Sequence, residues 1–453
     1  MAQITLAQAA RWCGGTIDPK YADVSFLGAS NDSRNIQPGQ LFVVLKGARD
    51  GHEFIPMAME KGAAAVLCNH CDGDYPAIVV EDTRIALGEI ARQERNRIGM
   101  KVVGVTGSVG KSTTKEMIAS VLETTYRVAK TPANHNNDIG MPMAILSIPE
   151  DTEVAVLEMG MNHFREIAYL TAISQPDVAV ITNIGTMHIE HLGSKEGILQ
   201  AKLEILKGLR TGGKILLNGD DEMLWKVRDT LKVPSVYFGA DNQECAVLAQ
   251  QVTGTENGLS FTVHAENLCL PVSLALEGQH YVLDALAAVS VGLQLNVKPQ
   301  CISNALGSFR NMAGRQEIFK IKGYTVIKDC YNAGPESMAA ALAVLGKKTG
   351  RRIAVLGDML ELGMRAAAEH YRIGRIAAEC ADWLFAYGPN GSRVVSGAIT
   401  GGMDTIHAQS YEDRKQLVNA LKAMAKPGDV LLFKGSHGMH MELALELFLQ
   451  EEA

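Results

Sequence analysis

Residues 106–114, TGSVGKSTT, have the residue types and the spacing of a loop that holds a nucleotide triphosphate. Gly107 and Gly110 allow a tight turn in which successive backbone N–H groups point at phosphate oxygens. Lys111 can reach the outer phosphates, and the Ser112 hydroxyl can bind Mg²⁺. The chemistry expected of such a loop is phosphoryl transfer. The nucleotide-binding residues predicted here are Gly107, Ser108, Val109, Gly110, Lys111, Ser112 and Thr113.

The loop departs from the usual G-x-x-x-x-G-K-[ST] spacing, because Val105 stands in place of the first glycine. The alternative interpretation is a structural glycine turn that contains Gly-Lys-Ser by chance. The residues after the loop favour the phosphate site, since Met117, Ile118, Val121 and Leu122 have helical spacing and predict a helix whose positive end faces the anion. The loop alone leaves a kinase, a switch-type NTPase and a ligase as alternatives.

Carboxylate and imidazole groups follow two other apolar runs and could hold the metal of a triphosphate site. Glu158 ends VAVLE, and His188 follows VAVITNIG. Singly, each could be a solvated strand end or a loop residue, but at neighbouring strand ends beside a phosphate loop they favour a metal site. Lys202 lies on a helix with an apolar stripe, and periodicity alone makes it a solvated surface lysine.

The elements that must position these residues form an α/β pattern with three predicted domains. Residues 1–98 predict a small α/β domain, with strand-like QLFVVLKG and helix-like FIPMAMEKGA. Residues 99–312 alternate apolar strands (VVGVTG, VAVLEMG, VAVITNIG and KILLNGD) with helices, which predicts a parallel sheet. Residues 313–453 repeat the alternation after the hinge-like FRNMAGRQ, which predicts a doubly wound, Rossmann-like domain without a phosphate loop.

The composition and charge of the chain argue against nucleic-acid-binding, membrane-inserted and disulfide-rich secreted proteins. The 453 residues are 47% hydrophobic and 21% charged, and the net charge of −7 gives no electrostatic footprint for nucleic acid. The N-terminus lacks a secretory pattern and no long apolar run occurs, so we expect a cytoplasmic protein without membrane insertion. The eight scattered cysteines predict reduced thiols. The CNHC segment at 68–71 could supply metal ligands, but a loop after a strand is favoured because no second pair stands at zinc-site spacing.

Segments along the whole chain resemble the ATP-dependent Mur ligases of peptidoglycan synthesis, whose shortened loop matches TGSVGKST and accounts for Val105. Their joint order and spacing make the resemblance specific. The matching segments are NHNNDIGMP, LEMGMNHFREI, TNIGTMHIEHLGS, AKLEI, LNGDD, GRQE, DCYNAGPESM, VLGDMLELG and FKGSHGMHME.

The resemblance implies an amide-bond ligase that uses ATP to activate a carboxylate as an acyl phosphate. The third-domain segments are most similar to those of the family member that joins D-alanyl-D-alanine to UDP-N-acetylmuramoyl-tripeptide, and the D-N-P-R segment of the diamino-acid-adding member is absent. The resemblance therefore implies these two substrates as partners, and we expect a monomer. The alternatives are another Mur-type ligase with a different amine, or a folylpolyglutamate- or cyanophycin-type ligase. The segment at 31–54, which looks like the family's UDP-sugar-binding segment, argues against the latter.

The resemblance also implies roles for individual residues. Lys202 would be carbamylated by CO₂, because a carbamate is an anionic oxygen ligand for Mg²⁺ whereas an ammonium would repel it. Lys111, Glu158, His188 and Lys202 would be catalytic, and Ser112, Glu158, His188 and carbamylated Lys202 would hold two Mg²⁺ ions. ATP would also contact His280, Arg315, Asp329 (at the ribose), Tyr331 and Asn332. The UDP-substrate would contact Ser33, Arg34, Lys46, Gly47 and His52.

Three positions depart from the family pattern. Tyr281 replaces the asparagine that usually follows the adenine-side histidine, Gly334 replaces the second asparagine of YNANP, and His437 replaces the arginine of KGSR. The first weakens the expectation for adenine recognition, and the other two weaken expectations for the amine pocket. Neither the third residue of the acceptor peptide nor the base that deprotonates the amine follows from the sequence.

Overall fold

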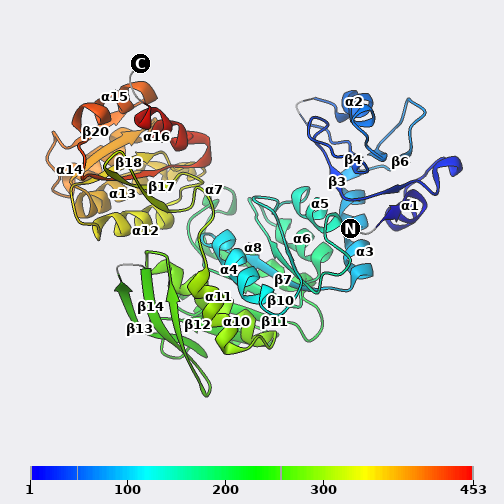
Figure 1. Ribbon diagram of the computed structural model, residues 1–453, viewed down its shortest axis with the longest axis horizontal. Helices are drawn as coiled ribbons and strands as arrows, with labels where there is room; N and C mark the ends of the chain where they lie inside the picture. Colours follow the sequence, from blue (N-terminus) through cyan, green and yellow to red (C-terminus); the bar gives the residue numbers. More distant parts are fainter. Residues whose placement is uncertain (1–2, 48, 256–257, 451–453) are drawn as a thin grey trace.

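Four β-sheets organise the computed structural model, which describes residues 3–47, 49–255 and 258–450. One mixed sheet forms the middle of the molecule, and the N-terminal and C-terminal units lie on opposite sides of it (Figure 1). Within the described residues, no helix is both long and apolar enough to cross a membrane.

The N-terminal unit contains a parallel four-stranded sheet in the order β3-β4-β5-β6 and a separate antiparallel pair, β1-β2. Its longest helix, α3 (Thr83–Ile98), begins where the Asp82 carboxylate accepts hydrogen bonds from two backbone N–H groups and ends at Gly99 in the left-handed conformation. The other elements are β1 (Ile4–Thr5), α1 (Leu6–Cys13), β2 (Ser25–Phe26), β3 (Ala29–Ser30), β4 (Leu41–Val43), α2 (Ile55–Glu60), β5 (Ala65–Cys68) and β6 (Ala77–Val79).

The central unit is built on a nine-stranded sheet in the order β15-β14-β13-β12-β11-β10-β7-β9-β8. Within the sheet, the neighbouring strands β13-β12-β11-β10-β7-β9-β8 pair in parallel. The strands β13, β14 and β15 pair antiparallel. The strands are β7 (Lys101–Thr106), β8 (Val128–Lys130), β9 (Val154–Glu158), β10 (Val178–Ile181), β11 (Lys214–Asn218), β12 (Ser235–Gly239), β13 (Val247–Thr255), β14 (Gly258–Ala265) and β15 (Leu268–Leu274).

Helices cover both faces of this sheet, because alternate strand residues enter two different cores. One core includes α4, α10 and α11, and the other includes α3, α5, α6 and α8. The helices of this unit are α4 (Lys111–Glu123), α5 (Gly140–Leu146), α6 (Glu166–Ser174), α7 (Ile189–Leu192), α8 (Lys195–Leu203), α9 (Glu222–Lys226), α10 (His280–Gln294) and α11 (Pro299–Ser308).

The C-terminal unit has a six-stranded sheet in the order β16-β17-β21-β18-β19-β20, which is parallel except for the edge strand β16. Its two cores place α12, α13 and α14 on one face and α15 and α16 on the other. The elements are β16 (Glu317–Ile321), β17 (Tyr324–Asp329), α12 (Pro335–Gly346), β18 (Arg352–Gly357), α13 (Ala366–Cys380), β19 (Trp383–Tyr387), α14 (Gly391–Thr400), β20 (Ala408–Tyr411), α15 (Arg414–Met424), β21 (Val430–Lys434) and α16 (Met441–Leu449).

The three-part α/β architecture predicted from the sequence is confirmed. The four apolar runs of the central unit form β7, β9, β10 and β11, and the apolar runs YTVIKDCY, RRIAVLGDM, DWLFAYG and DVLLFKGS of residues 313–453 form β17, β18, β19 and β21. Because these strands are parallel, their carboxyl ends meet at one edge of each sheet. Glu158 ends β9, and Lys111 and His188 stand in or just after the loops that follow β7 and β10, whereas Lys202 lies further along the chain, in α8.

Candidate active site

The loop between β7 and α4 forms a nest of backbone N–H groups at the carboxyl edge of the central sheet. Gly110 is left-handed (φ 82°), and a Cβ there would lie 2.6 Å from Asp284 Oδ1. At Gly107 a Cβ would lie 1.9 Å from Thr182 Oγ1, so only glycine fits at either position. Lys111 Nζ donates to the carbonyl oxygens of Gly107 (2.8 Å) and Ser108 (3.2 Å), and burial lowers its pKa.

Residues 182–185 clamp this loop, and no role was predicted for them. Asn183 is bonded twice to Val109, accepting from its N–H and donating to its carbonyl oxygen, both at 3.0 Å. Thr182 Oγ1 also donates to that carbonyl (2.6 Å), and the N–H of Gly185 donates to Ser108 Oγ (2.8 Å). The segment belongs to one of the family-like motifs, but only the folded chain shows that it fixes the loop's shape.

Glu158, the last residue of β9, is 2% exposed, which excludes the solvated strand end. Its Oε1 accepts a hydrogen bond from Asn136 Nδ2 (2.9 Å), whereas Oε2 has no hydrogen-bond partner among the described residues. The buried Lys115 ammonium lies 3.9 Å from Oε2, which is within ion-pair range but too far for a hydrogen bond, so this oxygen can still accept a closer partner. With the nearby Ser112 hydroxyl it offers the hard oxygen donors that Mg²⁺ prefers, so these residues fit that ion.

His188 lies in the left-handed region (φ 62°) immediately before α7, and it faces the C-terminal unit. Its Nδ1 lies 2.7 Å from Glu361 Oε2, the distance of an ion pair across the two units. The His188 ring lowers the pKa of Glu361 below its ordinary value. His188 is therefore held at the interface rather than in a free loop.

Lys202, on α8, is 2% exposed, so the surface position inferred from helical periodicity is wrong. Burial, with the charge of Lys111 as a smaller cause, lowers its pKa well below the ordinary value. Throughout residues 3–47, 49–255 and 258–450, no side chain forms a hydrogen bond or ion pair with its Nζ. An isolated, buried amine of this kind is uncharged over a wider pH range than an ordinary lysine.

A cavity of about 590 Å³ between the central and C-terminal units joins most of the predicted nucleotide site. Gly107 and Lys202 are not on its wall, nor are the five residues predicted to bind the UDP-substrate. The predicted residues that line the cavity are Ser108, Val109, Gly110, Lys111, Ser112, Thr113, Glu158, His188, His280, Arg315, Asp329, Tyr331 and Asn332.

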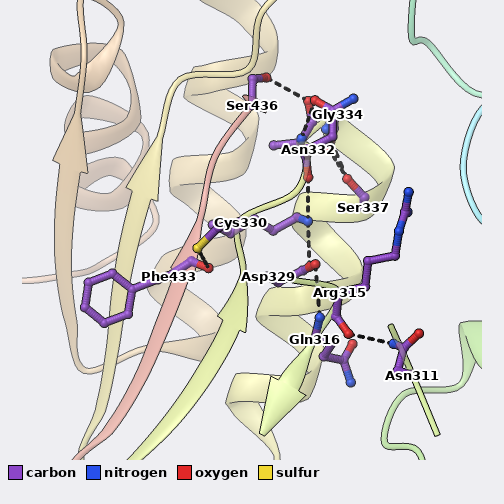
Figure 2. A network of polar contacts seen from close by, with 12 residues as sticks. Asn311, Arg315, Gln316, Asp329, Cys330, Asn332, Gly334, Ser337, Phe433 and Ser436 are labelled. Atoms are coloured by element: carbon purple, nitrogen blue, oxygen red, sulfur yellow. Dashed lines mark hydrogen bonds and ion pairs between the residues drawn. The ribbon is translucent and has the colours of Figure 1, made fainter. Parts of the chain in front are cut away.

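Arg315 reaches from the C-terminal side of the hinge into the phosphate loop. Its Nη2 donates to Ser112 Oγ (2.8 Å), and its guanidinium lies over the Tyr331 ring, 4.1 Å from the centroid. Figure 2 shows Asp329 beside it at the end of β17, accepting a hydrogen bond from the backbone N–H of Gln316 (3.2 Å). Asp329 also forms an ion pair with the buried Lys434 (2.6 Å), which fixes its carboxylate at the cavity wall.

The positions that depart from the family pattern lie on or near the same wall. Burial lowers the pKa of His280 to about 4, so its ring is neutral, and the Tyr281 hydroxyl accepts from Asn311 Nδ2 (2.7 Å) in the hinge. A Cβ at Gly334 would lie 2.8 Å from Met187 Cγ, so the approach of the central unit favours glycine there. The His437 ring lies 6.1 Å from that of Tyr331 and does not line the cavity.

The residues predicted to bind the UDP-substrate lie in the N-terminal unit. Ser33 is buried, and Arg34 is exposed and pairs with Asp32, whose pKa it lowers to about 2. His52 lies 2.5 Å from Asp50 and stacks on His70. Lys46 and Gly47 stand in the turn that leads to Asp50.

The CNHC segment is divided between a strand and a loop. Cys68 ends β5, where burial raises its pKa to about 12, and Cys71 follows in the loop. Within the part of the chain that the structure describes, no three His, Cys, Asp or Glu side chains are grouped to hold a metal ion. A metal at Glu158 and His188 would therefore require donors of other types, such as a hydroxyl, a carbamate or phosphate oxygens.

The chain is similar to known proteins over nearly its whole length. Models of the Mur ligase family match residues 24–95 (catalytic domain), 105–292 (middle domain) and 314–437 (glutamate ligase domain). The UDP-N-acetylmuramoyl-tripeptide--D-alanyl-D-alanine ligase of Bacillus subtilis is 38% identical, over 98% of this chain and 97% of its own. A crystal structure of MurF from Acinetobacter baumannii has a TM-score of 0.92 at 30% identity, with full coverage of both chains. MurF ligase from Thermotoga maritima, solved in complex with ADP, has a TM-score of 0.83 at 29% identity and covers 93% of this chain and 97% of its own.

Proposed function

Because the chain belongs to the Mur ligase family, we propose that it joins D-alanyl-D-alanine to UDP-N-acetylmuramoyl-tripeptide at the expense of ATP, releasing ADP and phosphate. Relatives that align over nearly the whole chain carry this activity in their name. The observation that carries the proposal is the cavity, in which Lys111, Glu158 and Arg315 converge from two units on the space beside the phosphate loop.

The chemistry explains why ATP is needed. A carboxylate and an amine do not condense in neutral water, so the acid must first acquire a leaving group. The peptide carboxylate oxygen attacks the γ-phosphorus of ATP and ADP departs, which leaves an acyl phosphate. The dipeptide ammonium loses one proton and the resulting amine attacks the acyl carbon. The tetrahedral intermediate then loses a second proton from nitrogen and expels phosphate with the former carboxylate oxygen.

The residues of the chain supply position and charge for these steps. The loop N–H groups hold the phosphates, while Lys111 and Arg315 neutralise the charge that develops during transfer. In the structure, Lys111 Nζ donates to two loop carbonyl oxygens and Arg315 donates to Ser112 Oγ. Phosphate oxygens can take the place of these partners. Mg²⁺, held by Ser112, Glu158 and His188, would add further neutralisation of the phosphate charge.

Carbamylation of Lys202 is part of the proposal and rests on its environment. CO₂ reacts with a neutral amine, and burial favours that form by lowering the pKa of Lys202. The carbamate would add an anionic oxygen donor near the phosphate loop, where the charge of Lys111 acts on Lys202. The lack of an ion-pair partner for Nζ in the described chain supports a modified rather than a charged lysine.

The remaining assignments of the binding site are also proposals. The ribose would contact Asp329, and adenine would lie near His280, Tyr331 and Asn332, all of which line the cavity. The UDP-substrate would contact the N-terminal unit through Ser33, Arg34, Lys46, Gly47 and His52. The division into residues 1–98, 99–312 and 313–453 is supported by the separate sheets of the three units.

Phosphate release by the purified protein with ATP and a panel of acids and amines tests this function. We expect release to require both the UDP-tripeptide and D-alanyl-D-alanine. Release that proceeds with folate and glutamate, or with another amine in place of the dipeptide, would support the rival ligases. Release that requires neither acid nor amine would indicate a switch-type NTPase. A Lys111→Ala variant provides the background for contaminating activity.

A further inference from the structure

Glu336, near the start of α12 in the C-terminal unit, contacts the central unit. Its Oε1 accepts hydrogen bonds from both the backbone N–H and the Oγ1 of Thr186, each at 2.9 Å. The carboxylate also packs on Gly185, where a Cβ would lie 2.9 Å from Glu336 Cδ. Two hydrogen bonds and this close approach fix the orientation of the carboxylate.

The second oxygen of this carboxylate is unsatisfied. Glu336 Oε2 is buried and accepts no hydrogen bond, and no lysine, arginine or histidine forms an ion pair with Glu336 within the described ranges. Glu336 lines the cavity, and its neighbour Gly185 donates to Ser108 of the phosphate loop. An anionic oxygen fixed in this way without a donor favours a ligand that brings one.

The charges of the substrates indicate which ligand this is. The triphosphate and the reacting peptide carboxylate are anionic, so an unpaired carboxylate would repel both. The incoming dipeptide carries an ammonium group, which donates three hydrogen bonds and must reach the acyl phosphate beside the phosphate loop. Glu336 stands on the C-terminal wall of that space, next to Ser337 and Ala340, which also line it.

We propose that Glu336 binds the ammonium group of the incoming dipeptide and holds its nitrogen beside the acyl carbon, which the nitrogen attacks after it has lost one proton. This inference rests on the proposed function, because it concerns the second substrate of that reaction. This role also explains the contact with Thr186. Because Thr186 belongs to the central unit, its two hydrogen bonds direct Glu336 Oε2 into the cavity only when the central and C-terminal units are in contact.

Steady-state kinetics of Glu336→Gln tests the proposal, because the amide oxygen can still accept from Thr186 while the charge is lost. A charge-assisted hydrogen bond contributes about 1.5–3 kcal/mol, so we expect the KM for D-alanyl-D-alanine to rise roughly 10- to 100-fold. The KM values for ATP and the UDP-tripeptide should stay near those of the unmodified enzyme. Acyl phosphate formed without the dipeptide, trapped by borohydride reduction, should also be unchanged.

Two further variants separate this role from a structural one. Glu277→Gln removes an ion pair with Lys348 (2.5 Å) that joins the same two units away from the cavity wall, and it should leave the dipeptide KM unchanged. Thr186→Val removes one of the two contacts that orient Glu336 while its charge remains. It should therefore raise the dipeptide KM less than Glu336→Gln does.

The outcomes are distinguishable. If the unmodified enzyme releases no phosphate in response to the dipeptide, the proposed function itself is wrong. If it does, and Glu336→Gln has an unchanged dipeptide KM, only the role of Glu336 is wrong. A rise in the UDP-tripeptide KM alone would assign the carboxylate to an amine of the acceptor peptide. Equal rises in the ATP KM for Glu336→Gln and Thr186→Val would show that Glu336 only joins the two units.

Discussion

At the scale of single residues, burial separates what the sequence could predict from what it could not. The chemistry of Lys111 and Ser112 follows from their spacing, because a phosphate loop is a local structure. The burial of Lys202 was not predicted, because lysines on amphipathic helices are mostly solvated, although its spacing from Ile198 (i+4) and Leu199 (i+3) places it on the apolar face. Its environment comes from elements distant in sequence, as do the contacts of His188 with Glu361 and of Glu336 with Thr186.

We predict that Lys202→Ala abolishes turnover and that short carboxylic acids partly restore it, because they can occupy the place of the carbamate oxygens. Lys207→Ala, which removes an exposed lysine of the next turn, is the matched control and should remain active. Phosphate release with and without added carboxylate measures the effect. A Lys202→Ala enzyme with unchanged turnover would end the carbamate hypothesis.

The lowered pKa of Lys202 also predicts how activity depends on pH. The neutral amine reacts with CO₂, and it becomes protonated as the pH falls through its pKa. Activity should therefore fall on the acidic side, and added bicarbonate should extend the acidic limb to lower pH. Initial rates across the pH range with and without bicarbonate measure this shift. Identical acidic limbs would argue against a carbamate.

At the scale of elements, the hydrophobic pattern predicted most of the central parallel strands but not every element. Strands such as β9 and β10 are buried on both faces and form continuous apolar runs. Strand β12 was not predicted, and neither was α3, which buries Glu94 and Arg95 among its apolar residues. Arg95 donates to the carbonyl oxygens of Ser174 and Gln175, partners that no local pattern can reveal.

The clamp on the phosphate loop gives a prediction at this scale. Asn183→Ala removes both hydrogen bonds to Val109, so the loop N–H groups lose their fixed orientation. We expect the KM for ATP to rise roughly 10-fold or more, because each bond contributes about 1 kcal/mol. Asn242→Ala, which removes a turn contact to Gly219 outside the cavity, should leave it unchanged. Equal ATP KM values for the two variants would contradict the clamp.

At the scale of the whole molecule, the active site exists only where the central and C-terminal units meet. Arg315, Glu336 and Glu361 all cross this interface from the C-terminal side. The hinge-like FRNMAGRQ segment and the Arg315 position across it predict that the units open and close around the substrates. The sequence indicated the hinge, but the residues that meet across it became apparent only in the folded chain.

We predict that an ATP analogue together with the UDP-tripeptide changes the X-ray scattering profile toward a more compact particle. Arg315→Ala should weaken this change, because the guanidinium no longer links the C-terminal unit to Ser112 and the phosphates. Arg310→Ala, which alters an arginine that donates to the nearby carbonyl oxygens of Ser308 and Phe309, is the control. Profiles that are identical with and without ligands would argue against closure.

The proposed phosphorylation of a peptide carboxylate in the cavity moves a carboxylate oxygen to the released phosphate, and an isotope label can follow this oxygen. A UDP-tripeptide labelled with ¹⁸O in its terminal carboxylate is converted with ATP and D-alanyl-D-alanine, and the released phosphate is analysed by mass spectrometry. With both carboxylate oxygens labelled, we expect one ¹⁸O atom in each phosphate, because the carboxylate oxygen becomes the bridging oxygen of the acyl phosphate. Unlabelled phosphate released during formation of the peptide product would contradict it.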